Sequence, residues 1–223
     1  MKSFLIGSLF TLVVMGHAPL MAGVIHGTLK VPTLVAVQAA MNPYPGRANS
    51  MPGHHSKATG GVVDAVIHVD HVPAATESVL AAAARTRLQL AQSNQAFVPR
   101  VLAIAVGEAV DFPNQDPIYH NVFSLSPVRR FDLGKYSRGK SRRVQFPRPG
   151  LVNVYCDIHS DMEAFVLVLP HHGFARPSSS GVFQLPNLPA GQYTVRVWHP
   201  DFGERTAKVA VPETGMVAVD LDY

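Results

Sequence analysis

The fold is decided by the stretch Val152-Asn153-Val154-Tyr155-Cys156-Asp157-Ile158-His159-Ser160-Asp161-Met162. A β-strand is predicted up to Cys156, and His159 and Met162 then lie on the short loop that follows it. His120, which is followed by Asn121, lies 36 residues before Cys156 and is predicted to begin another strand. We expect this strand to bring His120 to the same end of a β-sandwich, so that a rigid sheet fixes all four side chains.

The four side chains form one set of metal ligands. A thiolate and two imidazoles in a trigonal plane, with a weak axial thioether, are the ligands of a copper electron-transfer site. The soft sulfur ligands favour Cu(I) and the imidazoles also suit Cu(II), so both oxidation states fit nearly one geometry. Zinc is the alternative ion, but a structural zinc site is a closed set of nitrogen and thiolate ligands, and a methionine argues against it.

Cys156 is the single cysteine of the chain, so no internal disulfide forms. A buried, inert cysteine that packs as a small apolar residue is the common alternative to a ligand. The histidine three residues later and the methionine three residues after that favour the ligand. Each of these residues alone is weak evidence, and the prediction rests on their combination.

The composition predicts an all-β protein. Hydrophobic residues make up 47% of the 223-residue chain and charged residues 15%, with 18 prolines and 17 glycines. Such a composition suits many short strands joined by turns. The predicted strands, separated by Gly and Pro, cover residues 24–31, 62–69, 88–92, 98–106, 109–112, 121–125, 142–146, 150–156, 163–169, 182–185, 191–198, 204–211 and 216–221. Regular punctuation of this kind is typical of a sandwich or Greek-key barrel.

The stretch from about Gln89 to Leu169 resembles the cupredoxin family. The similar segments are Phe97-Val98-Pro99, residues 106–114, the His-Asn pair, and Pro149-Gly150 before the cysteine strand, and the short ligand loop is most similar to that of amicyanins, as in methylamine-utilization-type periplasmic cupredoxins. The resemblance, which extends to plastocyanin-like proteins, implies one type 1 (blue) copper with His120, Cys156 and His159 as equatorial ligands and Met162 as the axial ligand. It also implies that Asn121 lies behind the ligands, with its side chain tying the two ligand loops together.

The two ends of the chain carry a second resemblance. Residues 181–195 resemble the carboxypeptidase regulatory-like β-sandwich, whose first strands are similar to residues 24–31 and 64–69. This implies a cupredoxin domain at 88–170 inserted into a smaller, discontinuous β-sandwich of residues 23–74 and 171–223. Residues 75–87 are expected to be a linker that includes a short helix. The second sandwich is assigned no chemistry.

The N-terminus predicts export. Lys2, an apolar run from Phe4 to Met15 and small residues that allow cleavage after Ala18 or Ala22 have the order of a secretory signal peptide over residues 1–22. An uncleaved anchor is the alternative, but the apolar run is shorter than the about 20 residues that a span needs. We therefore expect a periplasmic protein with no stable membrane insertion after the signal is removed.

Positive charge is concentrated between the first histidine ligand and the cysteine. Eight of the 19 Lys and Arg residues fall in the twenty residues from Arg129 to Arg148, against one acid, Asp132. This segment is either a solvated loop face or a patch that steers an acidic redox protein to the metal. Nucleic acid is not expected as a partner, because an aromatic-basic binding motif is missing from the sequence.

Three functions compete. The first is a carrier of single electrons that docks by the apolar rim around His159, and the second is copper handling, as a chaperone or store with the same ligands. The third is a metal-free interaction module. An enzyme of the copper oxidase or nitrite reductase type is not expected, because the sequence offers no second set of clustered ligands.

The remaining histidines have simpler explanations. His54-His55 and His171-His172 are expected to be solvated loop pairs, with a secondary copper site as the alternative. Trp198-His199-Pro200 is expected to form a turn.

Overall fold

A computed structural model describes residues 22–32, 61–84 and 87–223. Most of the predicted signal peptide and the pair His54-His55 lie outside these residues, and Ala22 is the first residue of strand β1. The described residues form 18 β-strands, one α-helix and one 3-10 turn, which confirms the predicted all-β class. None of the helices in the described residues is long and apolar enough to span a membrane.

Nine strands from the middle of the chain pair only with one another and form what we call the central sandwich. They are β3 (Ala91–Ser93), β4 (Ala96–Val98), β5 (Val101–Ala105), β6 (Ala109–Pro113), β7 (His120–Ser124), β8 (Phe131–Tyr136), β9 (Ser141–Gln145), β10 (Gly150–Tyr155) and β11 (Glu163–Leu169).

One layer of the central sandwich is a five-stranded sheet in the order β5-β11-β10-β7-β8. The other layer contains the β6-β9 pair and the β3-β4 hairpin. Two isolated bridges connect them: Gln89, just before β3, pairs with Asp111 of β6, and Gln92 of β3 pairs with Asn114, the residue after β6. Both layers contribute to one buried core: Phe112 and Val144 come from β6 and β9, and Val152, Val154 and Val166 come from β10 and β11. This shared core makes the two layers a sandwich, because each sheet buries one face against the other.

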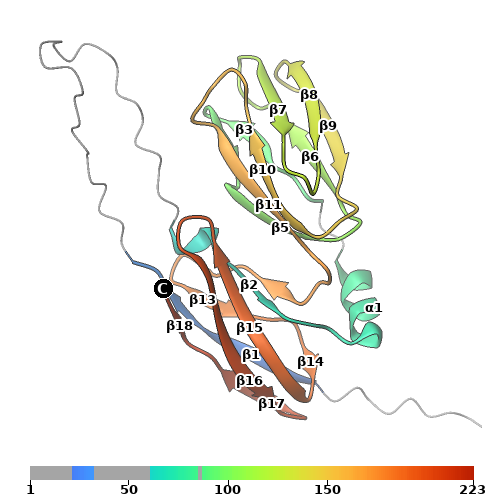
Figure 1. Ribbon diagram of the computed structural model, residues 1–223, viewed down its shortest axis with the longest axis vertical. Coiled ribbons are helices and arrows are strands. Elements are labelled where there is room, and N and C mark those ends of the chain that lie inside the picture. The colour runs from blue at the N-terminus through green and yellow to red at the C-terminus, as the bar shows by residue number, and fades with distance from the viewer. Residues whose placement is uncertain (1–21, 33–60, 85–86) are drawn as a thin grey trace, which may run out of the picture.

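The two ends of the chain form a second set of strands, the flanking sandwich (Figure 1). Its elements are β1 (Ala22–Lys30), η1 (Val62–Asp64), β2 (Val66–Val69), β12 (Phe174–Ala175), β13 (Val182–Gln184), β14 (Leu188–Pro189), β15 (Gly191–His199), β16 (Gly203–Val211), β17 (Gly215–Ala218) and β18 (Leu221–Asp222). Strand β1 pairs with β13, β14, β17 and β18, and β2 lies between β12 and β15. Strands far apart in the sequence therefore complete one another's sheets, and each shields an edge that would otherwise be open.

The helix α1 (Ala74–Ala83) connects β2 to the central sandwich, which confirms the short helix expected in the linker. Only Thr76 of its residues is buried, which agrees with the weak amphipathic pattern of its alanine-rich sequence.

The two sandwiches share a small core of their own. Phe165 of β11 packs edge-on against Trp198 of β15, with 5.9 Å between the ring centroids. Beside them Arg100 donates from Nη1 to Asp64 (3.2 Å) and to Asp201 (2.9 Å), and its guanidinium lies over the Phe165 ring. The Arg100 side chain is only 17% exposed and that of Asp64 only 8% exposed, so these charges depend on one another for compensation.

Three sequence expectations about the strands are corrected. Segment 98–106 is not one strand, because Pro99 and Arg100 separate β4 from β5. The basic segment contains one strand that was not expected, β8, whereas β9 agrees with the strand expected at 142–146. His199 is not in a turn: β15 continues through it, and its ring is fully buried against Phe202 and Tyr223.

The contact between the sandwiches predicts a large effect for one substitution. Arg100→Ala should lower the free energy of unfolding by about 3 kcal/mol, because it leaves the buried Asp64 carboxylate without its ion-pair partner. The control is Arg196→Ala, which removes an exposed ion pair with Glu204 and should cost less than about 1 kcal/mol. Urea unfolding of both variants measures the difference, and equal costs would contradict a structural role for Arg100.

Candidate metal centre

The loop that carries three of the predicted ligands is closed by the pairing of β10 with β11. These strands are antiparallel, and Tyr155 pairs with Glu163 at their last register position. The Cys156 N–H then donates to the carbonyl of Met162 (3.3 Å), and the Met162 N–H donates to the carbonyl of His159 (3.1 Å). The ladder therefore extends into the loop, and these hydrogen bonds fix the backbone positions of Cys156, His159 and Met162.

The fourth predicted ligand comes from the neighbouring strand of the same sheet. His120 is the first residue of β7, which pairs with β10, and its side chain is fully buried. The Nδ1 atoms of His120 and His159 lie 3.1 Å apart, and each lies 3.9 Å from Sγ of Cys156. Two strands and one loop thus place three donor atoms in a triangle, which is the one His, Cys and carboxylate cluster with metal-binding spacing among the described residues.

The triangle fits a first-row transition metal. The three donor atoms are 3.1 to 3.9 Å apart, so one ion with metal–sulfur and metal–nitrogen distances of about 2.3 and 2.0 Å could bind all three. A trigonal His₂Cys plane is the arrangement used by electron-transfer copper sites. The residues present therefore fit copper, and the strands around them have the cupredoxin-like arrangement that the sequence motifs predict.

Asp116 positions the buried histidine, and the sequence analysis missed it. Its Oδ2 lies 2.8 Å from Nε2 of His120, so the other ring nitrogen, Nδ1, is directed at the thiol. The carboxylate also accepts hydrogen bonds from the N–H groups of Asn94 (2.6 Å) and Gln95 (2.8 Å), the two residues with positive φ at the tip of the β3-β4 hairpin. A hairpin in the second layer therefore fixes the orientation and the tautomer of a ligand in the first.

The electrostatics of this group favour a charged Asp116 and a neutral His159. Burial by itself would raise the pKa of Asp116, but hydrogen bonds from Gln95, His120 and Asn94 together bring it below its ordinary value. Burial, and after it the charge of His120, lowers the pKa of His159. A neutral imidazole is the form that binds a metal, so a low pKa keeps His159 competent near neutral pH.

Met162 and Asn121 are both buried, and the hydrogen bond of Asn121 differs from what the resemblance implies. The Met162 side chain is 1% exposed and belongs to the same buried cluster as Cys156. The Asn121 side chain is also buried, but its amide donates to Asp132 in β8 (2.8 Å). Its hydrogen bond therefore joins β7 to β8 and not the two ligand loops, which corrects that expectation.

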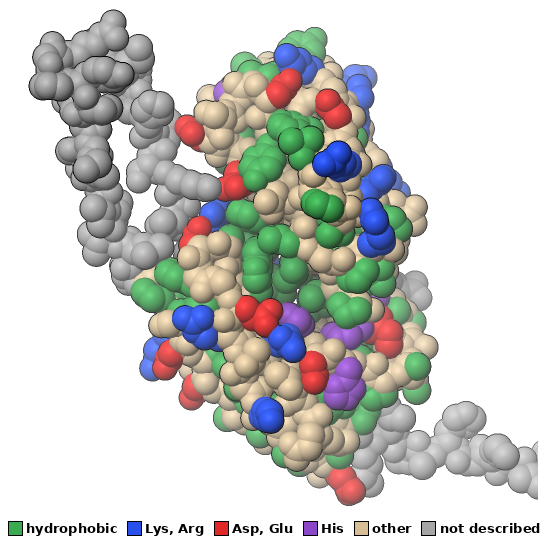
Figure 2. Space-filling view, in the orientation of Figure 1, with side chains coloured by type: hydrophobic (Ala, Val, Ile, Leu, Met, Phe, Trp, Pro, Cys, Tyr) green, Lys and Arg blue, Asp and Glu red, His purple; other side chains and the backbone are tan. Residues whose placement is uncertain are grey.

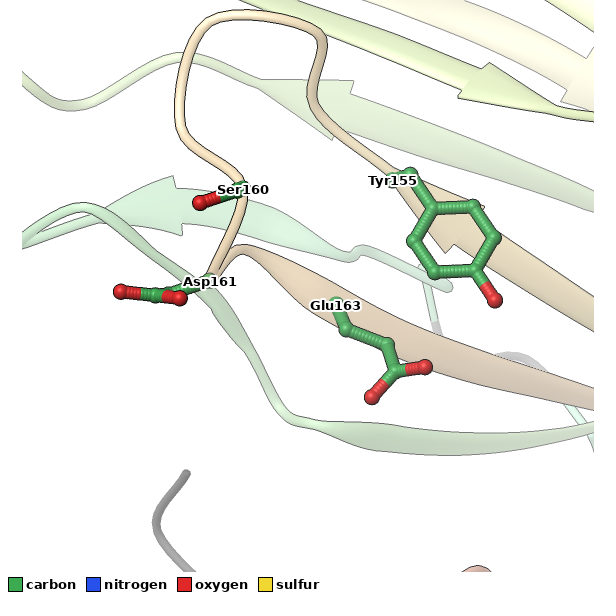
Figure 3. Close-up of a pocket in the computed structure, with 4 residues that line it drawn as sticks. All are labelled: Tyr155, Ser160, Asp161 and Glu163. Atoms are coloured by element: carbon green, nitrogen blue, oxygen red, sulfur yellow. The ribbon is translucent and has the colours of Figure 1, made fainter. Parts of the chain in front are cut away.

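A shallow pocket lies beside the ligand loop, on the side of β11 (Figure 3). It is lined by Tyr155, Ser160, Asp161 and Glu163, and the phenol of Tyr155 and the carboxylate of Glu163 project from neighbouring strands into the same space. On the opposite side of the loop, Nζ of Lys135 in β8 lies 3.8 Å from the carboxylate of Asp157. The pocket side of the loop thus carries two acidic side chains, whereas on the side of β8 the Asp157 carboxylate is paired with a lysine.

The pair His171-His172 is neither solvated nor part of a metal cluster with the required spacing. His171 is buried, and Nδ1 of His172 lies 2.6 Å from the carboxylate of Glu77 in α1. This ion pair fixes the end of the connection between the two sandwiches, so the sequence expectation of an exposed pair is wrong.

Comparisons with solved structures find similarity for part of the chain. A Cu-containing nitrite reductase from Thermus scotoductus SA-01 is 25% identical, with 38% of this chain and 22% of that one covered and a TM-score of 0.36. A purple cupredoxin from Nitrosopumilus maritimus is 22% identical over 37% of this chain and 99% of its own, with a TM-score of 0.34. A reduced amicyanin variant is 20% identical over 40% and 89%, with a TM-score of 0.35. No family model matches the chain, and no curated protein matches it.

The position of Asp116 predicts that it contributes to metal affinity. Asp116→Asn should weaken copper binding by about 10- to 100-fold, because the amide cannot accept all three hydrogen bonds and no longer fixes the ring of His120. Competition against a chelator measures the affinity. Asp220→Asn is the control, since this carboxylate also accepts two hydrogen bonds, both from Thr28, but lies in the flanking sandwich. Equal affinities for both variants and the unmodified protein would exclude the positioning role.

Proposed function

We propose that this chain is an exported type 1 (blue) copper protein that carries single electrons between redox partners. The observation that carries the proposal is the triangle of Cys156 Sγ and the two histidine Nδ1 atoms, with sides of 3.9, 3.9 and 3.1 Å. When bound, copper would supply a reversible couple between Cu(I) and Cu(II). The soft sulfur and the two imidazoles suit both states.

The roles of the residues follow from their burial. Cys156 and His120 are buried and would hold the ion away from water, and Asp116 would keep the ring of His120 in one orientation. His159 is only partly buried, and it is the ligand nearest to solvent. We therefore assign it the transfer of the electron to a partner. Met162 is the proposed weak axial ligand, buried beside Cys156.

The surface next to the ligands supports docking of a partner. Ile158, which precedes His159, is 41% exposed, and Ile118 and Tyr119, which precede His120, are 40% and 61% exposed. Large exposed apolar side chains around a partly exposed ligand favour transient contact with another protein. Export to the periplasm belongs to the same proposal and rests on the signal-like N-terminal sequence.

Copper handling by the same ligands is the alternative, and the held geometry argues against it. A site that passes on its ion needs ligands that move, whereas the backbone hydrogen bonds of the loop and the Asp116 contact hold these in place. Absorption spectroscopy with metal analysis separates the two roles. A carrier should bind one copper, show an intense visible band and lose copper slowly, whereas a colourless Cu(I) protein that gives its ion to an acceptor would contradict the proposal.

Cys156→Ser should abolish the visible band and most of the copper affinity, because the band arises from charge transfer between the thiolate and Cu(II). The spectrum of the copper-titrated variant measures this. A variant that stays blue would rule out Cys156 as the ligand.

Met162→Leu should keep the colour and shift the reduction potential, because the axial bond is long and weak. Voltammetry of the reconstituted variant measures the shift. Complete loss of copper, or an unchanged potential, would contradict the axial role of Met162.

A further inference from the structure

Two cations lie on the turn between β8 and β9, which follows Tyr136, the residue that pairs with His120. We call residues 137–140, which include Arg138 and Lys140, the basic turn. Both side chains are exposed, and neither forms an ion pair or hydrogen bond through its side chain within the described part of the chain. By contrast, Lys135 and Arg143 face Asp157 and Asp111. The positive charge of the basic turn is therefore not neutralised by the protein itself.

Asn114 holds the basic turn against the segment that carries the histidine ligand. This buried residue accepts from the Gly139 N–H through its backbone carbonyl (2.8 Å), and its own N–H donates to the carbonyl of Lys140 (2.9 Å). Its side chain donates to the carbonyls of Ile118 and Tyr136 and accepts from the Asp116 N–H, each at 2.9 Å. Through Asn114, the backbone of the turn is thus linked to Asp116 and Ile118 in the segment before His120.

The rest of the basic segment extends this charge along one side of the central sandwich. Figure 2 shows Lys and Arg side chains over the side where Figure 1 places β8 and β9. Arg142 lies over the ring of Tyr136, with 5.3 Å between the guanidinium carbon and the ring centroid. Tyr136 in turn pairs with His120 across β7 and β8. The end of the central sandwich that carries the metal ligands therefore adjoins the Lys and Arg side chains of β8 and β9.

Two acids near the metal centre lie on the other side, whereas Asp157 of the ligand loop is paired with Lys135. Asp161 and Glu163 line the pocket at β11, which is separated from β8 by β10 and β7 in the sheet order. An acidic partner would be attracted by the basic turn and repelled from the pocket side. The charges around the ligands therefore select one docking orientation.

Protection of exposed strand edges explains only part of this charge. β8 pairs only with β7, and β9 only with β6, among the described strands, and Lys or Arg on such edges hinders unwanted pairing. The basic turn is not a strand edge, however, and Asn114 links its backbone to that of the exposed Ile118. An apolar centre with a charged rim is the usual composition of a transient protein interface.

We propose that the basic turn, with the exposed apolar residues next to His120 and His159, is the docking surface for an acidic redox protein. This inference rests on the proposed electron-transfer function. The cations would raise the encounter rate of an anionic surface with the metal centre, and the apolar residues would exclude water from the contact. One electron would then pass from Cu(I) to the oxidised partner, which leaves Cu(II) and a partner reduced by one electron.

Two small oxidants of opposite charge test the surface in the copper-loaded, full-length protein. Stopped-flow spectroscopy follows oxidation of the Cu(I) protein by hexacyanoferrate(III), an anion, and by tris(phenanthroline)cobalt(III), a cation, each of which accepts one electron. In the double variant Arg138→Glu with Lys140→Glu, the first reaction should slow by about fivefold or more and the second should accelerate. At an ionic strength of about 0.1 M, charges beyond about 10 Å are largely screened, so the effect reports charges near the metal.

The matched control carries Lys30→Glu and Lys208→Glu, the same change of charge on exposed residues of the flanking sandwich. It should change either rate by less than about twofold, because these charges are remote from the metal centre. Equal effects of the two double variants, or rates insensitive to the charge of the oxidant, would overturn the proposal.

A second measurement needs no metal. Fluorescence anisotropy of a labelled poly-aspartate peptide should show salt-sensitive binding to the metal-free protein that weakens by about fivefold or more in the basic-turn variant and is retained by the control. Peptide binding without electron exchange would refute the proposed function and leave the docking surface supported. A protein that fails to bind the peptide but binds phosphatidylglycerol vesicles in a way that depends on Arg138 and Lys140 would have a lipid surface as its partner. This result would overturn the proposal.

Discussion

The hydrogen bond between Asp116 and His120 is the contact on which the metal centre depends. It joins the two layers of the central sandwich, because the carboxylate is held by the β3-β4 hairpin and the imidazole belongs to β7. It also leaves Nδ1 of His120 directed at Cys156. A strand alone would place the backbone of His120 and leave the ring free to rotate, whereas this contact fixes the donor atom itself.

The other side of the site is fixed by backbone hydrogen bonds. Antiparallel pairing of β10 and β11 continues into the ligand loop, where the Cys156 N–H and the Met162 carbonyl form the last contact. His159 therefore lies on a short loop whose two ends are hydrogen-bonded to each other. A geometry determined before an ion arrives changes little between oxidation states, and this is the physical condition for fast transfer of a single electron.

Much of the fold and of the ligand set could be predicted from the sequence. The spacing of Cys156, His159 and Met162 and the alternation of turns with short apolar runs are local signals, and the structure brings the two histidines and the cysteine together. Asp116 could not be predicted in this way, because its role depends on a hairpin that lies about twenty residues earlier in the chain. The same limit applies to His171, His172 and His199, whose burial results from contacts between segments far apart in the sequence.

In the basic segment, local composition indicates neither the strand β8 nor the surface formed by the basic turn. Phe131 and Leu133 pack against the central core from β8, but the cations around them suggest a loop. Asn114 then connects the cations of the basic turn to the ligand-bearing segment, which no local pattern indicates. Charge, ligands and exposed apolar residues thus meet at one end of the sandwich.

X-ray absorption spectroscopy at the copper edge tests the central claim most directly. With one equivalent of copper bound to the full-length protein, the account predicts one short copper–sulfur bond from Cys156 and two copper–imidazole bonds. A spectrum with only nitrogen and oxygen neighbours would contradict it.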